Sequence, residues 1–158
     1  YETNVQRLRE RLIGWELYRR SSSHREDQLQ RLEKLYQRIF PGRSFAGIEP
    51  MRDIGDPTRE DFYFLLTDGE KRYDLVEMSS GEQAVFAILF EMVHLRIGNS
   101  IILIDEVDLN MHPSAAQLLV SQLPKIAPDC QFILTTHSEA VTSIMGADEI
   151  YRFPGARI

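Results

Sequence analysis

Cysteine is nearly absent from this sequence. Cys130 is the single cysteine among 158 residues, so no disulfide can form within the chain. It adjoins an apolar stretch, where an unreactive core thiol is the ordinary interpretation. No apolar run approaches the roughly 20 residues that a membrane-spanning helix needs, and an initiating Met and a signal peptide are also lacking. We therefore expect a cytoplasmic protein with no membrane contact, of which this chain is a segment.

Positive charge is scarce as well, because the formal net charge is −6 at pH 7. Residues 1–40 nevertheless hold nine Lys and Arg against six Asp and Glu, while the remaining 118 residues hold nine against eighteen. Bulk charge does not favour a nucleic-acid partner, and contact with a polyanion would involve the N-terminal stretch. A solvated helix surface is the more ordinary interpretation of the same arginines. They are Arg7, Arg9, Arg11, Arg19 and Arg20.

Residues 1–42 predict an antiparallel helical hairpin. Apolar residues recur at spacings of three and four in two stretches, the pattern of a helix with one apolar side. They are Val5, Leu8, Leu12 and Trp15 in the first stretch, and Leu29, Leu32, Leu35, Tyr36 and Ile39 in the second. Ser23 is a candidate N-cap for the second helix, with Glu26 as its capping-box partner. The "FPG" sequence at 40–42 ends that helix.

The period changes after the hairpin, and we assign residues 43–158 to a second unit. Residues 44–51 and 61–67 alternate as strands do. The Asp-Gly pair at 68–69 is typical of a hairpin turn, and residues 72–78 return as a third strand. This part predicts a small antiparallel β segment.

Helices and strands alternate from residue 79 onward, which indicates α/β layering with a parallel sheet flanked by helices. The first helix starts near Gly81 and places Ala84, Val85, Ile88, Met92 and Leu95 on its buried side. The other elements are a strand in "SIILID", a helix from Pro113, a strand in "QFILTTHS", a short helix, and a strand in "EIYRF". The continuous aliphatic strands predict burial on both faces.

The acids Asp105 and Glu106 end the first aliphatic strand of this part. In open α/β folds, ligands bind at the carboxyl edge of the parallel sheet, where these side chains would lie. An Asp there suits Mg²⁺, and the adjacent Glu suits a base that activates water. An acid pair that caps a helix at a strand exit is the alternative.

Two further motifs predict polar groups at the same place. The "MSSGEQ" sequence at 78–83 opens a helix, where hydroxyls, backbone N–H groups and the helix dipole favour an anion. Taken alone, a plain helix cap by Ser79 or Ser80, with Glu82 or Gln83 completing a capping box, is the more ordinary interpretation. The "TTHS" sequence at 135–138 ends a parallel strand on His137 at the edge that carries the acids. His137 is then a phosphate donor or a water ligand, or an ordinary satisfied polar group.

In this order, the three motifs resemble those of the C-terminal lobe of an ABC-type ATPase head, a P-loop NTPase fold. "MSSGEQ" is similar to the signature motif, "IILIDE" to the Walker B strand and "TTHS" to the switch-histidine strand. The "DEVDLNMHP" sequence is less like a transporter and more like SMC-, RecF- and OLD-like AAA ATPases. The resemblance covers about residues 27–153.

The resemblance implies a role for each matching residue. Asp105 is the Mg²⁺-linked Walker B acid, Glu106 the catalytic base and His137 the switch histidine. The signature that caps ATP on a partner subunit is formed by Ser79, Ser80, Gly81 and Glu82. Asn110 and His112 lie in the D-loop region, although His112 stands where transporters carry Asp. The implied ligands are ATP and Mg²⁺.

One required motif is missing, because no Gly-x-x-x-x-Gly-Lys-[Ser/Thr] sequence occurs in the chain. Without that loop nothing cradles the β- and γ-phosphates. We therefore expect the P-loop lobe on another segment of the same protein or on a second chain. The resemblance further implies a head-to-tail homodimer, or a higher oligomer, that forms on ATP.

Three functions fit this pattern. The first is an ATPase in DNA maintenance or antiphage defence, with DNA or a nuclease effector as a partner. The second is a non-catalytic module whose nucleotide only controls assembly, against which the intact set of Asp105, Glu106 and His137 argues. The third, a transporter nucleotide-binding subunit, is weakened by the D-loop sequence.

Overall fold

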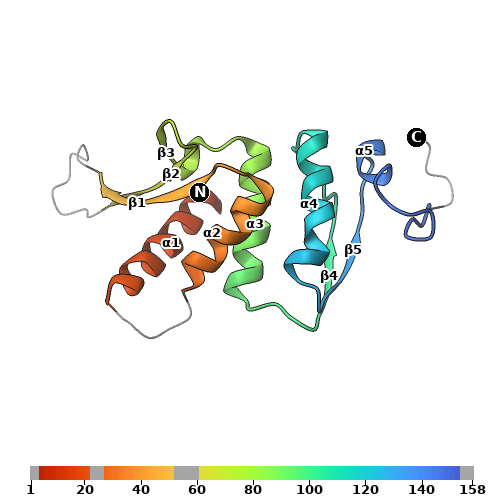
Figure 1. Ribbon diagram of the computed structural model, residues 1–158, viewed down its shortest axis with the longest axis horizontal. Helices are drawn as coiled ribbons and strands as arrows, with labels where there is room; N and C mark the ends of the chain where they lie inside the picture. Colours follow the sequence, from red (N-terminus) through yellow and green to blue (C-terminus); the bar gives the residue numbers. More distant parts are fainter. Residues whose placement is uncertain (1–3, 22–26, 52–60, 154–158) are drawn as a thin grey trace.

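The computed structural model describes residues 4–21, 27–51 and 61–153. Two helices and an antiparallel sheet surround one side of a central helix, and a helix and two parallel strands lie on its other side (Figure 1). One cluster of buried apolar side chains runs through both parts, from Leu12 to Val141. The described chain is therefore a mixed α/β structure with a continuous core. No helix in these ranges is long and apolar enough to cross a membrane.

The predicted helical hairpin is confirmed as α1 (Asn4–Ser21) and α2 (Gln28–Ile39). The N-cap of α2 is Asp27, whose carboxylate accepts a bond from the Gln30 N–H at 3.0 Å. The capping box expected at Ser23 and Glu26 lies outside the described residues. Both helices share the core of the residues that follow, so the division at residue 42 stays a prediction.

The antiparallel segment is confirmed with one correction. It contains β1 (Ser44–Pro50), β2 (Phe62–Thr67) and β3 (Arg72–Asp74), paired in that order. The third strand is shorter than predicted because a 3₁₀-helix, η1 (Leu75–Glu77), follows it at once. The Glu77 carboxylate accepts a bond from the Asp74 N–H at 2.9 Å, and this capping box turns the chain away from the sheet.

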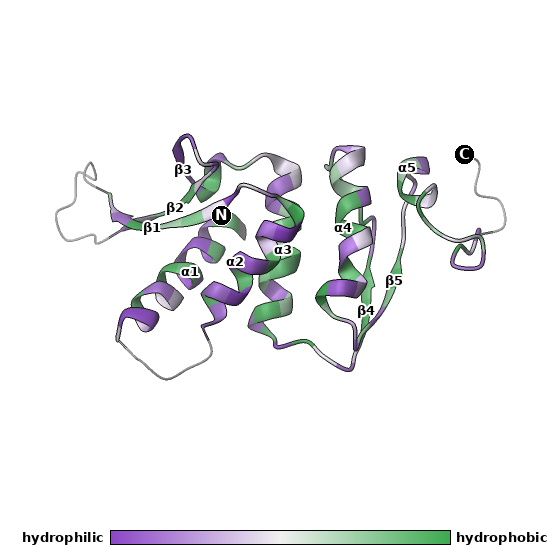
Figure 2. Cartoon of the chain, viewed as in Figure 1, coloured by the Kyte–Doolittle hydropathy of each residue, from purple (hydrophilic) through white to green (hydrophobic). Residues whose placement is uncertain are grey.

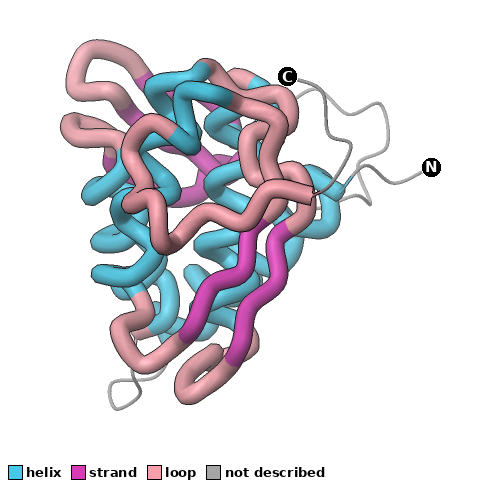
Figure 3. Tube along the Cα trace, turned by 90° about the vertical axis from the view of Figure 1, so that its right-hand side faces the viewer, coloured by secondary structure: helices cyan, strands magenta, loops and turns pink. Residues whose placement is uncertain are grey.

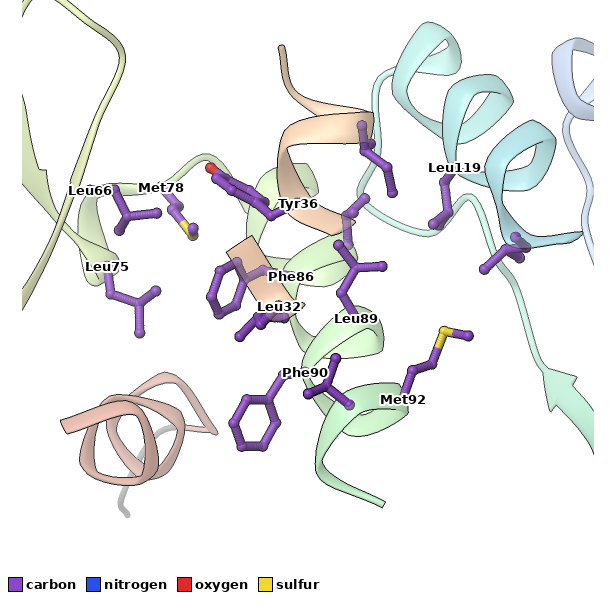
Figure 4. Packing of buried hydrophobic residues seen from close by; sticks show 14 of the residues in the cluster. Leu32, Tyr36, Leu66, Leu75, Met78, Phe86, Leu89, Phe90, Met92 and Leu119 are labelled. Carbon is purple, nitrogen blue, oxygen red and sulfur yellow. The ribbon is translucent and has the colours of Figure 1, made fainter. Parts of the chain in front are cut away.

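The central helix is α3 (Ser80–His94). Phe86 and Phe90 point toward α1 and α2, whereas Leu89 and Met92 point toward α4 (Pro113–Ile126) (Figure 4). The sequence predicted one buried side for this helix, whereas the structure covers it on two sides, by α1 and α2 and by α4. Leu95, which we assigned to that side, lies beyond the helix and is 61% exposed.

The parallel strands are β4 (Ile101–Ile104) and β5 (Gln131–Leu134), connected through α4 (Pro113–Ile126). The prediction that they are buried on both faces was wrong. Leu103 is 73% and Ile133 is 50% exposed. These strands are among the most apolar parts of the chain (Figure 2) and lie side by side at the surface in Figure 3. The reason is that α4 packs on one face, while no described segment covers the other. We call this surface, made by Ile101, Leu103 and Ile133, the open sheet face.

The last elements follow β5. The predicted short helix is α5 (Glu139–Thr142). The strand predicted at 149–153 was wrong, because these residues form no ladder in the described chain. Tyr151 and Phe153 are instead exposed and pack edge to face with ring centroids 5.6 Å apart.

Candidate functional site

The loops that follow β4 and β5 leave the sheet side by side. The register matches Ile104 with Leu134. Pairing continues one step further, since the Thr135 N–H donates to the Ile104 carbonyl and the Val107 N–H to the Thr135 carbonyl, both at 3.0 Å. The carboxyl ends of both strands therefore lie at one edge of the sheet, where the sequence predicted the site.

The two predicted site acids and the predicted switch histidine lie at this edge. Asp105 and Glu106 follow β4 directly, and both are exposed. Along β5 and beyond, exposure alternates, so that Ile133, Thr135 and His137 are exposed while the residues between them are partly covered. Thr135 lies opposite the first acid, and His137 comes two residues later.

The Thr135 side chain links the two loops. Its hydroxyl donates to Asp105 Oδ1 and accepts a bond from the Glu106 N–H at 2.7 Å. Glu106 has φ +48°, in the left-handed region that non-glycine residues seldom adopt. The β4 chain therefore turns sharply at the residue expected to be the base. Sequence reasoning missed Thr135, although it belongs to the "TTHS" motif.

Thr136 makes a second contact between the loops. Its hydroxyl donates to Asp108 Oδ1 and accepts a bond from the Ser138 N–H at 3.0 Å. Both threonines of the motif thus bind acids of the loop after β4, and His137 follows them directly. Two adjacent hydroxyls before a histidine are the signal that would have identified them.

The signature turn lies against the same loop. Ser79 caps α3, and its hydroxyl accepts a bond from the Glu82 N–H at 3.2 Å. The Ser80 hydroxyl donates to the Asn110 carbonyl at 3.3 Å. A Cβ at Gly81 would lie 3.4 Å from Asn110 O and 3.4 Å from the Cα of residue 111, at van der Waals contact with the loop backbone. The structure therefore brings the signature and the D-loop region together.

The D-loop region ends by starting α4. Asn110 has φ +61°, a conformation that Asn tolerates better than most residues. His112 is the N-cap of α4, with Nδ1 accepting a bond from the Ser114 N–H, and Pro113 occupies the first turn. This capping accounts for the His-Pro step without a ligand, and a nucleotide contact by His112 stays a prediction.

Glu82 is the signature residue whose side chain faces inward. It is 7% exposed, and its Oε1 accepts bonds from the hydroxyl of Tyr36 on α2 and, at 3.2 Å, from that of Tyr73 on β3. Burial, followed by the bond to Glu82, raises the pKa of Tyr36 far above its ordinary value of 10.0. Burial likewise raises the pKa of Tyr73. The Glu82 side chain is therefore engaged within the fold and its N–H in the helix cap, and a nucleotide contact by Glu82 stays a prediction.

Arg43 supplies positive charge to this buried cluster. Its Nε lies 3.9 Å from Glu82 Oε1, and its guanidinium donates to the Tyr73 hydroxyl at 2.9 Å. Burial lowers the pKa of Arg43, but attraction to Glu82 and the neighbouring groups outweighs it, so the pKa is raised. The first turn of α3 is thus tied to α2 and to the antiparallel sheet.

The acids at the sheet edge fit magnesium better than a metal that needs a protein cage. Within the described ranges, no group of three or more His, Cys, Asp or Glu side chains is arranged to hold a metal. Mg²⁺ is usually held by one or two carboxylates together with phosphates and water. Asp105 supplies one carboxylate at the position where an open α/β sheet places its ligands.

Comparison with known proteins identifies the family. Residues 1–143 match the model of the family described as "AAA domain, putative AbiEii toxin, Type IV TA system". The chain belongs to this family. The family and the fold are those of an ABC-type, SMC-like AAA ATPase domain.

Two curated relatives are named probable ATPases. The chain is 32% identical over 88 residues to the "Retron Ec83 probable ATPase" of Escherichia coli, a match that covers 49% of this chain and 16% of that protein. It is 31% identical over 87 residues to the "Retron Vc95 probable ATPase" of Vibrio cholerae serotype O1 biovar El Tor, covering 48% and 17%. The chain therefore corresponds to a small part of each relative.

Solved structures of SMC heads share the fold of this AAA domain. One, from work on "ATP-driven dimerization and DNA stimulated activation of SMC ATPases", aligns with a TM-score of 0.54 at 16% identity, covering 73% of this chain and 70% of that one. An SmcHead bound to the C-winged helix domain of ScpA aligns with a TM-score of 0.54 at 18% identity, covering 73% and 36%.

Proposed function

We propose that this chain is the signature-bearing lobe of an ATPase in which two heads pair head to tail on ATP. The observation that carries the proposal is the meeting of three motifs at one loop. Thr135 binds both Asp105 and Glu106, and the signature residue Ser80 binds the same loop at Asn110. A signature turn that contacts the loop carrying the acids fits a nucleotide shared between two molecules.

Each residue then has a defined task. Glu106 accepts a proton from the attacking water, and His137 donates to the γ-phosphate. Ser79, Ser80 and the Gly81 backbone bind the phosphates on the partner molecule, where the start of α3 favours an anion. Asp105 would hold Mg²⁺, which neutralises phosphate charge when bound. The β- and γ-phosphate cradle comes from a P-loop lobe, because the required sequence is missing here.

The test is Glu106→Gln in the full-length protein. Removal of a general base lowers turnover by about 10²- to 10⁴-fold. We expect ATP binding to persist and an ATP-bound dimer to accumulate in light scattering. Normal ATP turnover by Glu106→Gln would show that the base is misassigned. Glu149→Gln, an exposed glutamate after α5, is the matched control and should leave turnover unchanged.

The biological setting we propose is antiphage defence, in which the ATPase controls a nuclease or another effector. Its support is the similarity to two retron proteins that are named probable ATPases. DNA-stimulated turnover would instead favour DNA maintenance. DNA-stimulated activation is described for the SMC ATPases whose head has a similar fold. Measuring ATPase activity with and without DNA separates the two.

The second candidate is a module whose nucleotide controls assembly without hydrolysis. The presence of Asp105, Glu106 and His137 at one edge of the sheet favours hydrolysis over this alternative. Under the alternative, wild type and Glu106→Gln would bind ATP and assemble alike, and neither would release phosphate.

A further inference from the structure

The Thr135 hydroxyl makes two bonds of opposite sense to consecutive residues. It donates to the Asp105 carboxylate and accepts from the Glu106 N–H at 2.7 Å. Thr135 is exposed on a strand end, where water would otherwise satisfy its hydroxyl. A hydroxyl is among the few side-chain groups that donate and accept at once, so neither a carboxylate nor an apolar residue could replace both bonds.

The second bond coincides with unusual backbone geometry. Glu106 has φ +48°, and a non-glycine residue persists there only when its surroundings hold it. Its N–H is held by Thr135, and the next residue, Val107, donates to the Thr135 carbonyl at 3.0 Å. The residue directly after β5 therefore fixes the orientation of Asp105 and the turn at Glu106.

Thr135 itself is well suited to this task. Its carbonyl and N–H are engaged with Val107 and Ile104, so its backbone is fixed by the sheet. The β-branched side chain has restricted rotation about χ1, which keeps the hydroxyl in one direction. A rigid strand thus supports residues of a loop.

We propose that Thr135 is a positioning residue, which sets the direction of the Asp105 carboxylate toward magnesium and of Glu106 toward the attacking water. The proposal deepens the proposed function and rests on it. Thr136 has a different task, because its hydroxyl binds Asp108 and the Ser138 N–H, further along the loop.

The test uses the full-length protein with three substitutions. Thr135→Val keeps the shape but removes both bonds, and Thr135→Ser keeps the hydroxyl. Thr142→Val is the matched control, since its hydroxyl donates to the Ser138 and Glu139 carbonyls at the start of α5 and has no hydrogen bond to the proposed site within the described residues. Two readouts are measured: binding of Mn²⁺, as the probe for magnesium, by electron paramagnetic resonance with a non-hydrolysable ATP analogue, and ATP turnover.

We expect Thr135→Val to weaken Mn²⁺ binding and to lower kcat by about 10- to 100-fold, the usual effect of removing an outer partner of a metal ligand. Thr135→Ser should restore most of both, and Thr142→Val should resemble wild type. If Thr135→Val behaves like Thr142→Val in both readouts, the proposal is overturned. Normal turnover by Glu106→Gln would overturn the proposed function instead, and Mn²⁺ binding would still report on Thr135.

A measurement on the unaltered protein guards against a variant that misfolds. The Glu106 amide proton should exchange slowly with solvent, although its residue is exposed, because Thr135 accepts its bond. Residue-resolved hydrogen exchange should show protection at Glu106 that is lost in Thr135→Val and kept in Thr135→Ser. Exchange of the wild-type Glu106 amide at the rate of an unstructured chain would overturn the proposal.

Discussion

At the scale of single residues, the buried carboxylate of Glu82 explains how the signature turn is held from the interior of the fold. Tyr36, Tyr73 and Arg43 surround it, and they come from α2, β3 and the turn between α2 and β1. A buried charge is tolerated only when it is paired and hydrogen-bonded. The cluster therefore links the start of α3 to segments that are distant in sequence.

Removing one phenol should destabilise the fold. Tyr36→Phe keeps the ring but leaves Glu82 without one of its donors, which costs about 1–3 kcal/mol. We expect the free energy of unfolding, measured by urea denaturation at pH 7, to fall by that amount. Tyr63→Phe, at a 40% exposed tyrosine on β2, should change it little. Equal stability of Tyr36→Phe and wild type would contradict the importance of the cluster.

The same phenol predicts a loss of stability in alkali. The pKa of Tyr36 is raised in the folded chain above the ordinary 10.0, so the folded state keeps the proton when the unfolded state loses it. The contribution is therefore fully present below pH 10 and falls as the pH rises further. Wild type should lose stability between pH 10 and 11 more steeply than Tyr36→Phe. Parallel slopes in urea denaturation would contradict this assignment.

At the scale of elements, the N-terminus of α3 meets the loop between β4 and α4. Ser79 caps the helix, and Ser80 and Gly81 contact residues 110–111. This end of α3 is held from the side by the loop and from within by Glu82. The turn is thus formed within this chain, before any partner binds.

A bulky charge at this turn should prevent pairing without unfolding the chain. We expect Ser80→Arg to abolish the ATP-dependent dimer through steric clash, because Ser80 is exposed at the surface proposed to meet a partner. Light scattering of the full-length protein with ATP measures the effect. Ser121→Arg, on the exposed surface of α4, is the control. An unchanged dimer in Ser80→Arg would count against the proposed interface.

The sequence predicted elements well where a local signal decides them. The aliphatic runs at 101–104 and 131–134 became parallel strands, and Pro113 starts a helix. The prediction failed where contact with a distant segment decides whether an element forms. The predicted strand at 149–153 has no neighbouring strand in the described chain, and Leu95 lies past the last turn of α3.

The site was predictable in its position but not in its contacts. The order of the motifs indicated one edge of a parallel sheet, and the strands do end together there. The inward direction of Glu82 depends on tyrosines 46 and 9 residues away, which no spacing rule reveals. The role of Thr135 depends on the strand register, because only pairing brings it opposite Asp105.

At the scale of the whole molecule, the open sheet face is the feature that a monomeric domain would not keep. Parallel sheets are covered on both faces in almost all known cases. Here Ile101, Leu103 and Ile133 are at least half exposed, with values of 65%, 73% and 50%. We therefore expect the P-loop lobe of the full-length protein to pack there.

A charge on the open sheet face should therefore destabilise the full-length protein but make the isolated chain less prone to aggregation. Leu103→Lys should lower the melting temperature of the full-length protein, because burial of a lysine without a partner is unfavourable. For the isolated chain, it should reduce aggregation, because it interrupts an exposed apolar patch. Leu17→Lys, at a 48% exposed position on α1, is the control. An unchanged melting temperature of the full-length Leu103→Lys would argue against a covering lobe.

The short loop from Asp105 to His112 contacts the end of β5, the start of α3 and the start of α4 at once. In a head-to-tail pair, its acids would serve one ATP while the signature turn resting on it would touch the other. The two nucleotides of a pair could then not be processed independently. The rate of hydrolysis is expected to rise sigmoidally with ATP concentration. If the contacts of this loop with the end of β5 or with the start of α3 are removed, that curve should become hyperbolic.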